Sequence, residues 1–456
     1  MEKNLKEVFK ANDIRGVYGK ILDDDLAYKV GRAIAKFFRC KEIFIGRDMR
    51  LSSPALFKAL VRGLNESGVD AINLGLVDTP LIYFATGFYK KPGIMITASH
   101  NPAEYNGIKI VKAGARPVDS HNGFNKIRKN IENNSFIWTK IKGKIIKKDI
   151  FEEYKNYVLS FIDLSKINRI KVVVDAGNGM AGKIAPIIYK NLGVNIIPLY
   201  FKLDGEFPNH VPNPIIKKNL RVLAEKVRKE KANFGIAFDG DMDRVVFVDE
   251  KGRFVNTSFI GSLLAKYILQ KSRGSRKPAI IYSSAASRIM SEAILKYGGR
   301  PLREKVGHAY IKGRMRKKRA LFGMEHSAHY YYRNNYYADS GLITSLLVFE
   351  IYSLSKKQGL KFSDLLKEFD KYSQAEEVSF LLQDSEDILE KIEKYYVQKK
   401  DSKSINHFDG LTIEFSDYWF SVRKSNTEPL LRINLEAVDK ITMKEKLKEV
   451  LKVVKR

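Results

Sequence analysis

The chain has 456 residues, of which 44% are hydrophobic, and its 13 prolines are not part of any repetitive tract. This length exceeds what a single hydrophobic core supports, so we expect three or four domains, and the composition excludes a disordered protein. The single cysteine, Cys40, excludes an internal disulfide framework and a cysteine-based metal cluster. We expect Cys40 to be a buried, unreactive thiol in a reducing compartment.

Basic residues dominate the charge: 81 Lys and Arg stand against 52 Asp and Glu, for a formal net charge of +29. A field of this sign attracts anions of any size, from phosphorylated metabolites to nucleic acid. Acidic residues are interspersed among the basic ones, as in KKNLRVLAEKVRKEK (217–231), whereas a nucleic-acid-binding arm is a denser basic block. We therefore favour a generally basic surface and expect no nucleic-acid partner. Binding of nucleic acid or another anionic polymer stays the alternative interpretation.

The sequence begins MEKNLKEVFK, without the apolar core of a signal peptide. No stretch approaches the ~18 uninterrupted apolar residues of a membrane span. We expect a cytoplasmic protein with no membrane partner. We expect a monomer or a homodimer.

Short apolar runs, each leading into a polar or glycine-containing turn, recur along the first 300 residues. They are EIFIGRD (42–48), AINLGLVDTP (71–80), PGIMITASHNP (92–102), KVVVDAGNGMAG (171–182), NFGIAFDGDMDRVVFVDEKGRFV (233–255) and AIIYSS (279–284). Helical patterns follow several of them, and this alternation predicts α/β layers with parallel or mixed sheets. We interpret residues 233–255 as strand, polar loop, strand, turn and strand. In such sheets ligand-binding loops lie beyond the carboxyl ends of the strands, where these polar motifs fall.

A different pattern begins after residue 371. DILEKIEKYYVQKK (387–400) predicts an amphipathic helix, residues 411–438 predict two or three antiparallel strands, and KEKLKEVLKVVKR (444–456) predicts a closing helix. We therefore expect three successive α/β domains with mixed sheets, at residues 1–146, 147–250 and 251–370. A smaller C-terminal α+β domain is expected at residues 371–456.

Three carboxylates alternate in FDGDMDR (238–244): Asp239, Asp241 and Asp243. Carboxylates this close repel one another unless a cation joins them. Oxygen ligands select a hard ion, and a few carboxylates with an open position suit Mg²⁺ completed by a phosphate oxygen. A solvated acidic turn between two strands explains the motif equally well when it is taken alone.

Three further loops carry polar side chains at strand ends. TASHNP (97–102) places Ser99 and His100 before a proline turn, and Lys109 follows ten residues after Ser99. VRKSNTEP (422–429) is rich in hydrogen-bond donors that suit an anion, and GMEHSAH (323–329) combines an acceptor with a donor. Each loop taken alone is an ordinary turn, and no G-x-S-x-G elbow surrounds Ser99, so a hydrolase triad is poorly supported.

Taken together, in this order and spacing, these four motifs resemble the α-D-phosphohexomutase family, most closely its bacterial and archaeal phosphomannomutase/phosphoglucomutase branch. The resemblance spans almost the whole chain, because KANDIRGVYG (10–19), DAGNGMAG (175–182) and FPNHVPNP (207–214) are also similar to segments of that family. It implies four domains arranged around a central cleft. TASHNP is similar to the family's phosphoserine loop, DGDMDR to its metal loop, GMEHSAH to its sugar loop and RKSNTEP to its phosphate loop.

The resemblance implies that Ser99 carries a phosphoryl group and that Mg²⁺ binds Ser99, Asp239, Asp241 and Asp243. The phosphoryl group would pass to the free hydroxyl of a hexose 1-phosphate. The resulting 1,6-bisphosphate would turn around and return its other phosphate to Ser99. The expected activity is therefore interconversion of 1-phosphate and 6-phosphate, with a hexose 1,6-bisphosphate as activator.

The family's motifs also assign the remaining catalytic and substrate-binding residues. Lys109 is expected as the general acid/base, with a pKa lowered near Arg15, Arg244 and a metal ion, and Arg15 and His100 are expected beside the reaction. The residues expected to bind the phosphosugar are Arg244, Lys305, His308, Glu325, Ser327, Arg423, Ser425, Asn426 and Thr427. Glu325 and Ser327 would recognise sugar hydroxyls, and the 423–427 loop would hold the non-reacting phosphate.

Substrate choice depends on details of these loops. SNTEP and VGH (306–308) favour mannose and glucose phosphates, since phosphoglucosamine mutases usually show SGTEP and an Asp after VG. Ala328 and His326 stand where relatives often carry Gly and Met, and Met242 replaces a frequent Gly. Ala328 restricts its loop if a positive φ is required there. A phosphoglucosamine mutase, and next a metal-dependent sugar phosphatase that releases free phosphate, are the alternative functions.

Overall fold

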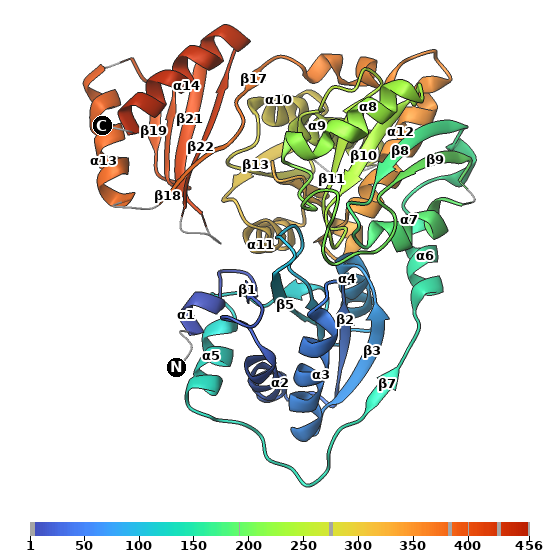
Figure 1. Cartoon of the computed structure of the whole chain (residues 1–456). Helices are drawn as coiled ribbons and strands as arrows, with labels where there is room; N and C mark the ends of the chain where they lie inside the picture. The colour runs from blue at the N-terminus through green and yellow to red at the C-terminus, as the bar shows by residue number, and fades with distance from the viewer. Residues whose placement is uncertain are drawn as a thin grey trace. The chain divides into compact units, whose positions relative to one another are not determined.

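The computed structural model describes residues 5–190, 192–272, 277–381, 385–399, 401–425 and 430–454 (Figure 1). The chain divides into two compact units. The first unit comprises residues 1–257 and 327–365, and the second comprises residues 258–326 and 366–456. Both units contain strands and covering helices.

A seven-stranded mixed sheet opens the first unit, in the order β1-β5-β4-β2-β3-β7 with β6 paired to β5. Its strands are β1 (Ile14–Val17), β2 (Glu42–Arg47), β3 (Asp70–Leu76), β4 (Gly93–Ile96), β5 (Tyr105–Lys112), β6 (Arg116–Pro117) and β7 (Ile145–Lys147). Strands β4, β2, β3 and β7 are parallel, and the others pair antiparallel. The chain passes from β2 to β3 on one side of β2 and returns to β4 on the other. The carboxyl ends of β2 and β4 therefore mark a switch point, where open α/β sheets bind ligands.

Helices cover both faces of this sheet. They are α1 (Leu5–Val8), α2 (Asp24–Phe38), α3 (Ser53–Glu66), α4 (Thr79–Phe88) and α5 (Phe124–Glu132). Ile43 and Ile45 of β2 join the apolar core that α2, α3 and α5 share. Phe44 points to the opposite face and its ring lies 5.4 Å from that of Tyr89, at the end of α4. The period-two alternation of β2 thus places apolar side chains on both faces, as expected for a sheet buried between helices.

The second sheet of this unit has the order β11-β10-β8-β9. Its strands are β8 (Ile170–Asp175), β9 (Val194–Leu199), β10 (Phe234–Phe238) and β11 (Val245–Asp249). The helices of this part are α6 (Phe151–Leu159), α7 (Ala181–Tyr189), α8 (Arg221–Lys229) and α12 (Gly341–Lys356). The unit also contains the antiparallel pair β15 (Tyr330–Tyr332) and β16 (Ala338–Asp339). The third strand expected within 233–255 is reduced to one bridge between Val248 and Phe254. The chain turns into a helix at Thr257, which leaves no length for a longer ladder.

The second unit combines a parallel sheet with an antiparallel one. Strands β13 (Arg300–Glu304) and β14 (Phe322–Met324) flank β12 (Ala279–Ser283), with helices α9 (Thr257–Lys271), α10 (Arg288–Lys296) and α11 (His308–Lys318). The antiparallel sheet contains β17 (Ser373–Gln374), β18 (Val378–Leu381), β19 (Ser404–Asn406), β20 (Leu411–Glu414), β21 (Tyr418–Lys424) and β22 (Leu430–Ala437), with α13 (Ser385–Lys399) and α14 (Lys440–Val454). Short 3₁₀ segments elsewhere in the chain are η1 (Leu164–Lys166), η2 (Lys217–Leu220), η3 (Arg333–Asn335) and η4 (Phe362–Phe369). The predicted α/β layers and C-terminal α+β region are confirmed.

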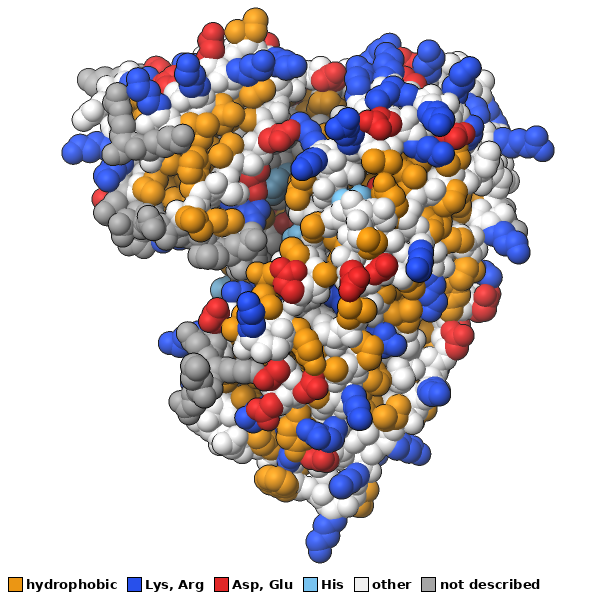
Figure 2. Space-filling model, in the orientation of Figure 1, with side chains coloured by type: hydrophobic (Ala, Val, Ile, Leu, Met, Phe, Trp, Pro, Cys, Tyr) orange, Lys and Arg blue, Asp and Glu red, His pale blue; other side chains and the backbone are white. Residues whose placement is uncertain are grey.

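The surface agrees with the charge pattern of the sequence. Figure 2 shows Lys and Arg side chains distributed over the visible face, with Asp and Glu side chains among them. Cys40 is half-buried and not fully buried as expected, and burial raises the pKa of its thiol to about 11, which disfavours the reactive thiolate. Among the residues that the structure describes, no helix has the length and apolar character needed to span a membrane.

Candidate active site

Ser99 lies just beyond β4, at the switch point of the first sheet. Its side chain is buried and its backbone has a φ of 51°, a left-handed conformation that is costly for a residue with a Cβ atom. The Ser99 N–H donates to Oγ1 of Thr97 at 2.9 Å, which stabilises the turn from within. A strained residue held at the end of a strand is typical of a functional site.

Arg50, which the sequence analysis did not select, holds this loop in place. Arg50 is 1% exposed, and its guanidinium group donates to four backbone carbonyls of the loop. These are the carbonyls of Ser99 (2.9 Å), Asn101 (2.6 Å), Pro102 (2.6 Å) and Tyr105 (2.9 Å). Asp48 at the end of β2 supports Arg50, with Nε to Oδ2 at 3.3 Å. An arginine in DMR (48–50) gives no sequence signal for this role, because its acceptors are carbonyls that only the fold brings together.

The loop of residues 239–244 joins β10 to β11 and is held by three segments of the first unit. The N–H groups of Thr79, Met180 and Gly341 donate to the carbonyls of Asp241 (3.0 Å), Gly240 (2.9 Å) and Met242 (3.2 Å), respectively. The loop also approaches Ser99 closely, since a Cβ atom at Gly240 would lie 2.5 Å from the Ser99 carbonyl oxygen. Only glycine fits at position 240 without displacing the serine loop.

The serine and the three aspartates form one buried cluster. Oγ of Ser99 donates to Oδ2 of Asp239 at 2.7 Å, and the three carboxylates of Asp239, Asp241 and Asp243 offer oxygens within 4.8 Å of one another. Oδ1 of Asp241 and Oδ1 of Asp243 are buried and accept no hydrogen bond. Buried carboxylate oxygens without donors, next to a hydroxyl, fit a hard divalent cation. This trio of aspartates can therefore bind a metal ion.

The surroundings of Lys109 differ from the expectation of a lowered pKa. Its Nζ, on β5, lies 2.7 Å from Oδ2 of Asp241 and 2.7 Å from Oδ2 of Asp243. Burial lowers the pKa of Lys109, but the two carboxylates outweigh burial and raise this pKa well above its usual value. The expectation of a lowered pKa was therefore wrong for this arrangement, because the ammonium group serves here as the counter-ion of the aspartates.

The pKa values of Asp239 and Asp243 are shifted in opposite directions. Burial and the charges of Asp243 and Asp241 raise the pKa of Asp239 well above its usual value. Burial also acts to raise the pKa of Asp243, but Lys109 and His329 outweigh it and hold this pKa well below the usual range. A cation nearby would favour the ionised form of the Asp239 carboxyl, which accepts the Ser99 hydroxyl.

Arg15 contacts the serine loop, and His100 is part of it. Arg15, on β1, pairs with Asp13 and donates through Nη1 to the side chain of Asn101. Nδ1 of His100 is 3.3 Å from Oγ of Ser99. Burial, followed by the charges of Arg244 and Arg15, holds the pKa of His100 well below its usual value, so His100 is neutral at neutral pH.

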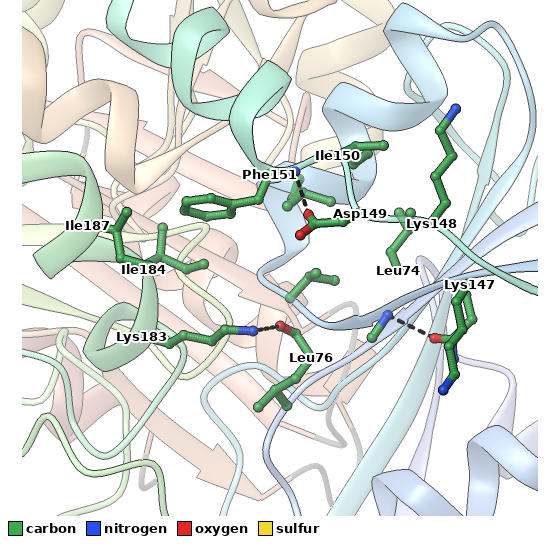
Figure 3. A pocket seen from close by; sticks show the side chains of 14 residues that line it. Leu74, Leu76, Lys147, Lys148, Asp149, Ile150, Phe151, Lys183, Ile184 and Ile187 are labelled. Carbon is green, nitrogen blue, oxygen red and sulfur yellow. Dashed lines mark hydrogen bonds between the residues drawn. The ribbon is translucent and has the colours of Figure 1, made fainter.

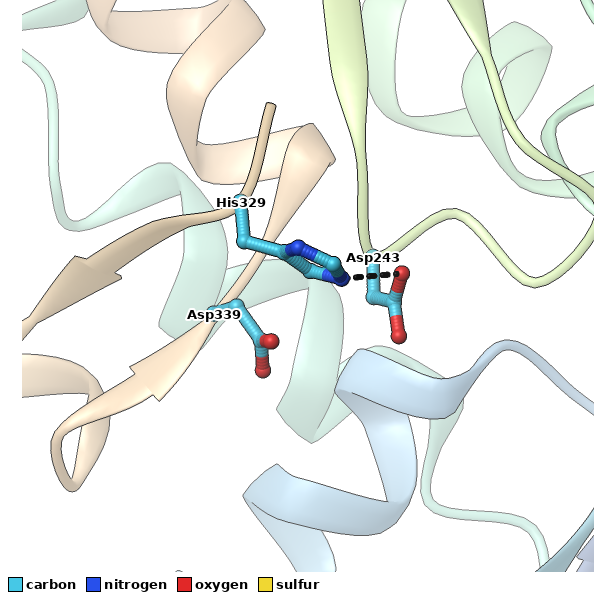
Figure 4. A group of neighbouring side chains, drawn as sticks. All are labelled: Asp243, His329 and Asp339. Carbon is cyan, nitrogen blue, oxygen red and sulfur yellow. Dashed lines mark ion pairs between the residues drawn. The ribbon is translucent and has the colours of Figure 1, made fainter. Parts of the chain in front are cut away.

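His329 joins this cluster, although the sequence analysis did not place it among the site residues. Its Nε2 lies 3.4 Å from Oδ1 of Asp243, and Nε of Arg244 donates to the same nitrogen at 3.2 Å. Its Nδ1 lies 2.9 Å from Oγ of Ser327. Figure 4 shows the imidazole directed at Asp243, with the Asp339 carboxylate from β16 close by. The sequence feature that could have identified His329 is its position two residues after Ser327, in a motif already selected.

Asp243, His329 and Asp339 also have ligand atoms within 4.8 Å of one another. The guanidinium group of Arg244 already donates to the imidazole nitrogen that faces Asp243. A second cation at this point would compete with that positive charge. We therefore interpret this group as a hydrogen-bonded extension of the aspartate cluster.

Two departures from the family pattern have a common backbone feature. Met242 has a φ of 64° and Ala328 a φ of 66°, and both are fully buried. The positive φ suspected at Ala328 is thus present. The carbonyl of Ala328 accepts the N–H of Val245 at 3.3 Å, so the two strained residues lie on neighbouring segments. Both positions favour glycine on conformational grounds, and each side chain is accommodated at a cost of about 1 kcal/mol or more.

Other expected substrate-binding residues lie in the second unit. Glu325 follows β14, is buried, and accepts the Gly307 N–H at 2.7 Å through Oε1. That contact fixes the segment that carries Lys305 and His308, where His308 is the first residue of α11. Lys305 is exposed, with Nζ 5.8 Å from the ring centre of Phe408. The structure thus joins Glu325 to the 305–308 segment.

The phosphate loop is described in part. Arg423, near the end of β21, is 4% exposed and donates through Nη2 to Oε2 of Glu377 at 3.2 Å. Ser425 donates its N–H to the carbonyl of Leu430 at 2.8 Å. Asn426 and Thr427 lie outside the described residues, so their expected roles stay predictions.

A separate cavity of about 580 Å³ lies in the first unit, between β3, the segment after β7 and helix α7 (Figure 3). Lys183 crosses it and donates to the carbonyl of Leu76 at 2.7 Å, and Asp149 accepts the N–H of Phe151. None of the site residues predicted from the sequence lines this cavity. It is therefore distinct from the cluster around Ser99.

Comparison with known proteins gives a consistent result along the whole chain. Four family models match in succession: the phosphoglucomutase/phosphomannomutase alpha/beta/alpha domains I, II and III at residues 6–138, 152–252 and 256–372, and the C-terminal domain at residues 377–453. A phosphomannomutase of Vibrio cholerae is 38% identical, with 99% of both chains covered. A Xanthomonas campestris protein named phosphohexose mutases is 37% identical, with 94% of both chains covered.

The fold is also shared with solved structures, over nearly the full length of the chain. A phosphoglucomutase/phosphomannomutase family protein of Burkholderia thailandensis superposes with a TM-score of 0.87 at 30% identity. The match covers 99% of this chain and 98% of that one. The sequence and the fold therefore match the same group of proteins.

Proposed function

This chain belongs to the phosphoglucomutase/phosphomannomutase family, and we propose that it interconverts hexose 1-phosphates and hexose 6-phosphates, with mannose or glucose as the sugar. The observation that carries the proposal is the 2.7 Å contact between Oγ of Ser99 and Asp239 within the buried aspartate trio. A hydroxyl placed beside a cation site is arranged to carry and release a phosphoryl group.

Phosphoserine at Ser99 is the proposed donor. The bond between phosphorus and Oγ of Ser99 breaks as phosphorus bonds to a hydroxyl oxygen of the hexose phosphate. The proton of that hydroxyl leaves to a base, and the freed Oγ of Ser99 takes up a proton to restore the serine hydroxyl. Reversal of these steps on the other phosphate of the 1,6-bisphosphate restores the phosphoserine and completes the isomerisation. A free hexose 1,6-bisphosphate would load Ser99 with phosphate, which explains its expected role as activator.

Asp239, Asp241 and Asp243 would hold Mg²⁺ together with an oxygen of phosphorylated Ser99. When bound, the ion supplies positive charge that offsets the negative charge on the phosphoryl group. The buried Oδ1 of Asp241, which accepts no hydrogen bond, supports this assignment. Arg15 and Arg244 add fixed positive charge around Ser99, and neutral His100 adds none.

Lys109 is the proposed general acid/base, under one condition. As long as its ammonium group is paired with Asp241 and Asp243, it donates hydrogen bonds and does not accept a proton. Loss of these two contacts would leave burial as the main influence and lower the Lys109 pKa toward that of a working base.

Recognition of the phosphosugar is assigned to the second set of residues. Glu325 and Ser327 are proposed to bind sugar hydroxyls, Lys305 and His308 to assist, and Arg423, Ser425, Asn426 and Thr427 to hold the non-reacting phosphate. The buried Arg423 guanidinium supports the last role, because arginine binds phosphate through several N–H groups at once.

The domain division at 1–146, 147–250, 251–370 and 371–456 stays part of this proposal, and the four successive family matches support it. We also propose a cytoplasmic enzyme, monomeric or homodimeric, whose partner is the phosphosugar. A phosphoglucosamine mutase is less supported, since the relatives described above are named for mannose and hexose phosphates.

The test is an assay with Mg²⁺ and a trace of hexose 1,6-bisphosphate, in which mannose, glucose and glucosamine 1-phosphates are offered separately. A mutase converts at least one of them to the 6-phosphate with almost no free phosphate released. Release of free phosphate in proportion to substrate consumed would instead identify a phosphatase, and the relative rates decide the sugar.

A further inference from the structure

Glu377, a residue outside every motif selected from the sequence, lies at the centre of a cationic cluster in the second unit. It lies between β17 and β18, and its side chain is 18% exposed. Four side chains contact its carboxylate: Arg432 through Nη1 (2.6 Å), and Asn434 through Nδ2 (3.1 Å), Arg423 through Nη2 (3.2 Å) and His326 through Nε2 (3.3 Å). Because a carboxylate only accepts, Nε2 of His326 carries the proton in this contact.

The two arginines require such an anion. Arg423 on β21 lies directly opposite Arg432 on β22 in the antiparallel register. Like charges directly opposite on neighbouring strands destabilise a sheet. Glu377 bridges the pair by taking one N–H from each. Although burial acts to raise the pKa of Glu377, His326, Arg423 and Arg432 hold it far below the usual range, so the carboxylate stays charged.

The contact with Glu377 does not use all the N–H donors of the Arg423 guanidinium group. The Arg423 contact with Glu377 uses Nη2, while its Nε is buried and has no acceptor among the described residues. A guanidinium group has five N–H donors in a fixed plane. Fixing one end of that plane therefore sets the direction of the donors that remain, which suits a second anion approaching from another side.

The fourth ligand connects two loops. His326 belongs to GMEHSAH, directly follows Glu325, and donates its backbone N–H to Oγ of Ser283 at 3.3 Å. A methionine, frequent at this position among relatives, cannot donate to Glu377. His326 thus gives this chain a link from the sugar loop through Glu377 to Arg423.

We propose that Glu377 is a positioning residue for the phosphosugar, which aims the Arg423 guanidinium at the non-reacting phosphate and, through His326, holds the sugar loop in register with it. The inference rests on the proposed function, because Arg423 is assigned to phosphate by that function. Glu377 itself does not touch the substrate.

Three variants test this role: Glu377→Gln, His326→Met and, as matched control, Glu376→Gln at the exposed neighbouring position. We would measure kcat and KM for the hexose 1-phosphate. We would also measure its Kd by calorimetry in a Ser99→Ala background, where affinity is read without turnover. Glu377→Gln should raise KM and Kd about tenfold with kcat within threefold, since an arginine hydrogen bond lost or misdirected is typically worth that much. His326→Met should raise both about threefold, and Glu376→Gln should change neither.

Thermal unfolding separates positioning from a purely structural role. If Glu377→Gln lowers the Tm while the Kd stays unchanged, Glu377 is only an ion pair of the fold and the proposal is wrong. If the Kd becomes smaller, Glu377 competes with phosphate for Arg423, which overturns it as well. His326→Met removes one ligand of four and decides the matter should Glu377→Gln fail to fold. If the wild type and Glu377→Gln bind hexose 1-phosphate equally well, only this inference is contradicted. If the wild type does not bind hexose 1-phosphate, the proposed function is contradicted as well.

Discussion

Ser99 and Asp239 are 140 positions apart in the sequence, yet Oγ of the serine donates to Oδ2 of the aspartate at 2.7 Å. This contact joins the turn after β4 of one sheet to the turn after β10 of another. The fold brings the two turns together because Thr79, Met180 and Gly341 bind the aspartate loop and Arg50 binds the serine loop. The fold of the first unit thus brings this serine and the three aspartates together.

Replacing Ser99 with Ala should lower turnover by at least about 10³-fold, because no neighbouring side chain can carry the phosphoryl group in its place. The measurement is the steady-state rate of 6-phosphate formation. Ser416→Ala, at an exposed turn before β21, is the control and should retain the normal rate. Near-normal turnover of the Ser99 variant would rule out a phosphoserine there.

Arg50→Lys should lower kcat at least about tenfold and destabilise the fold by about 3 kcal/mol. A lysine has no planar fork to reach four carbonyls, and it leaves buried acceptors without donors. Denaturant unfolding and steady-state kinetics measure the two effects. Arg47→Lys is a suitable control, because Nη1 of Arg47 makes a single 3.4 Å contact with the Asp48 carbonyl. If both variants behave alike, Arg50 does not organise the serine loop.

Lys109→Met tests the lysine as counter-ion. Without metal, the variant leaves buried carboxylates uncompensated, so its free energy of unfolding should fall by about 3 kcal/mol. Mg²⁺ should restore much of that loss, giving a larger Tm increase than in the wild type, and turnover should fall about 10²-fold or more. Lys112→Met, at the end of the same strand, should show none of these effects. Equal Mg²⁺-induced shifts in both variants would mean that Lys109 does not compete for the metal site.

Asp78 predicts a specific pH dependence of stability. Its buried carboxyl accepts the Tyr154 hydroxyl at 3.0 Å, and burial raises its pKa from 3.8 to about 7. Because the folded pKa is the higher one, the protonated group stabilises the fold below about pH 4, and this contribution is lost as pH rises toward 7. Asp78→Asn keeps an acceptor for Tyr154 and should be more stable than the wild type at pH 8 by about 2 kcal/mol, roughly half the limit set by ~1.4 kcal/mol per pKa unit.

Unfolding free energies between pH 4 and 8 test this prediction. The difference between Asp78→Asn and the wild type should grow across that range, and Asp25→Asn, at an exposed carboxylate, should run parallel to the wild type. A constant difference between Asp78→Asn and the wild type would show that Asp78 does not titrate there.

Arg423→Ala should raise KM for both the 1-phosphate and the 6-phosphate by about 10- to 100-fold, the range expected when charge-assisted hydrogen bonds to phosphate are lost. The reacting phosphate is held elsewhere, so kcat should change little. Arg221→Ala, at an 81% exposed side chain on α8, is the control. An unchanged KM for both sugars would remove Arg423 from the phosphate site.

The sequence predicted the fold where local pattern and tertiary structure agree. Buried runs such as GIMI and FGIAF became β4 and β10, and residues 411–438 contain the three antiparallel strands β20, β21 and β22. The third strand near 254 was overestimated, because the start of α9 shortens it to one bridge. Period-two patterns do not show where a following helix ends a strand.

The residues predicted for the site lie together in the structure where they belong to short contiguous motifs. Ser99 and the three aspartates could be found because each motif is contiguous and their family order is specific. Arg50 and Glu377 could not, since their partners are carbonyls or side chains that are brought near only by the fold. The Lys109 pKa was mispredicted for the same reason, as its two aspartate neighbours lie more than 130 positions away.

The most direct test of the proposed phosphoserine mutase is ³¹P NMR of the purified protein with Mg²⁺, a trace of hexose 1,6-bisphosphate and mannose or glucose 1-phosphate. We expect a 6-phosphate signal to grow at the expense of the 1-phosphate signal, with inorganic phosphate near its starting level. We also expect this conversion to be absent with Ser99→Ala. Growth of inorganic phosphate alone, or conversion that persists without Ser99, would contradict a mutase that works through this serine.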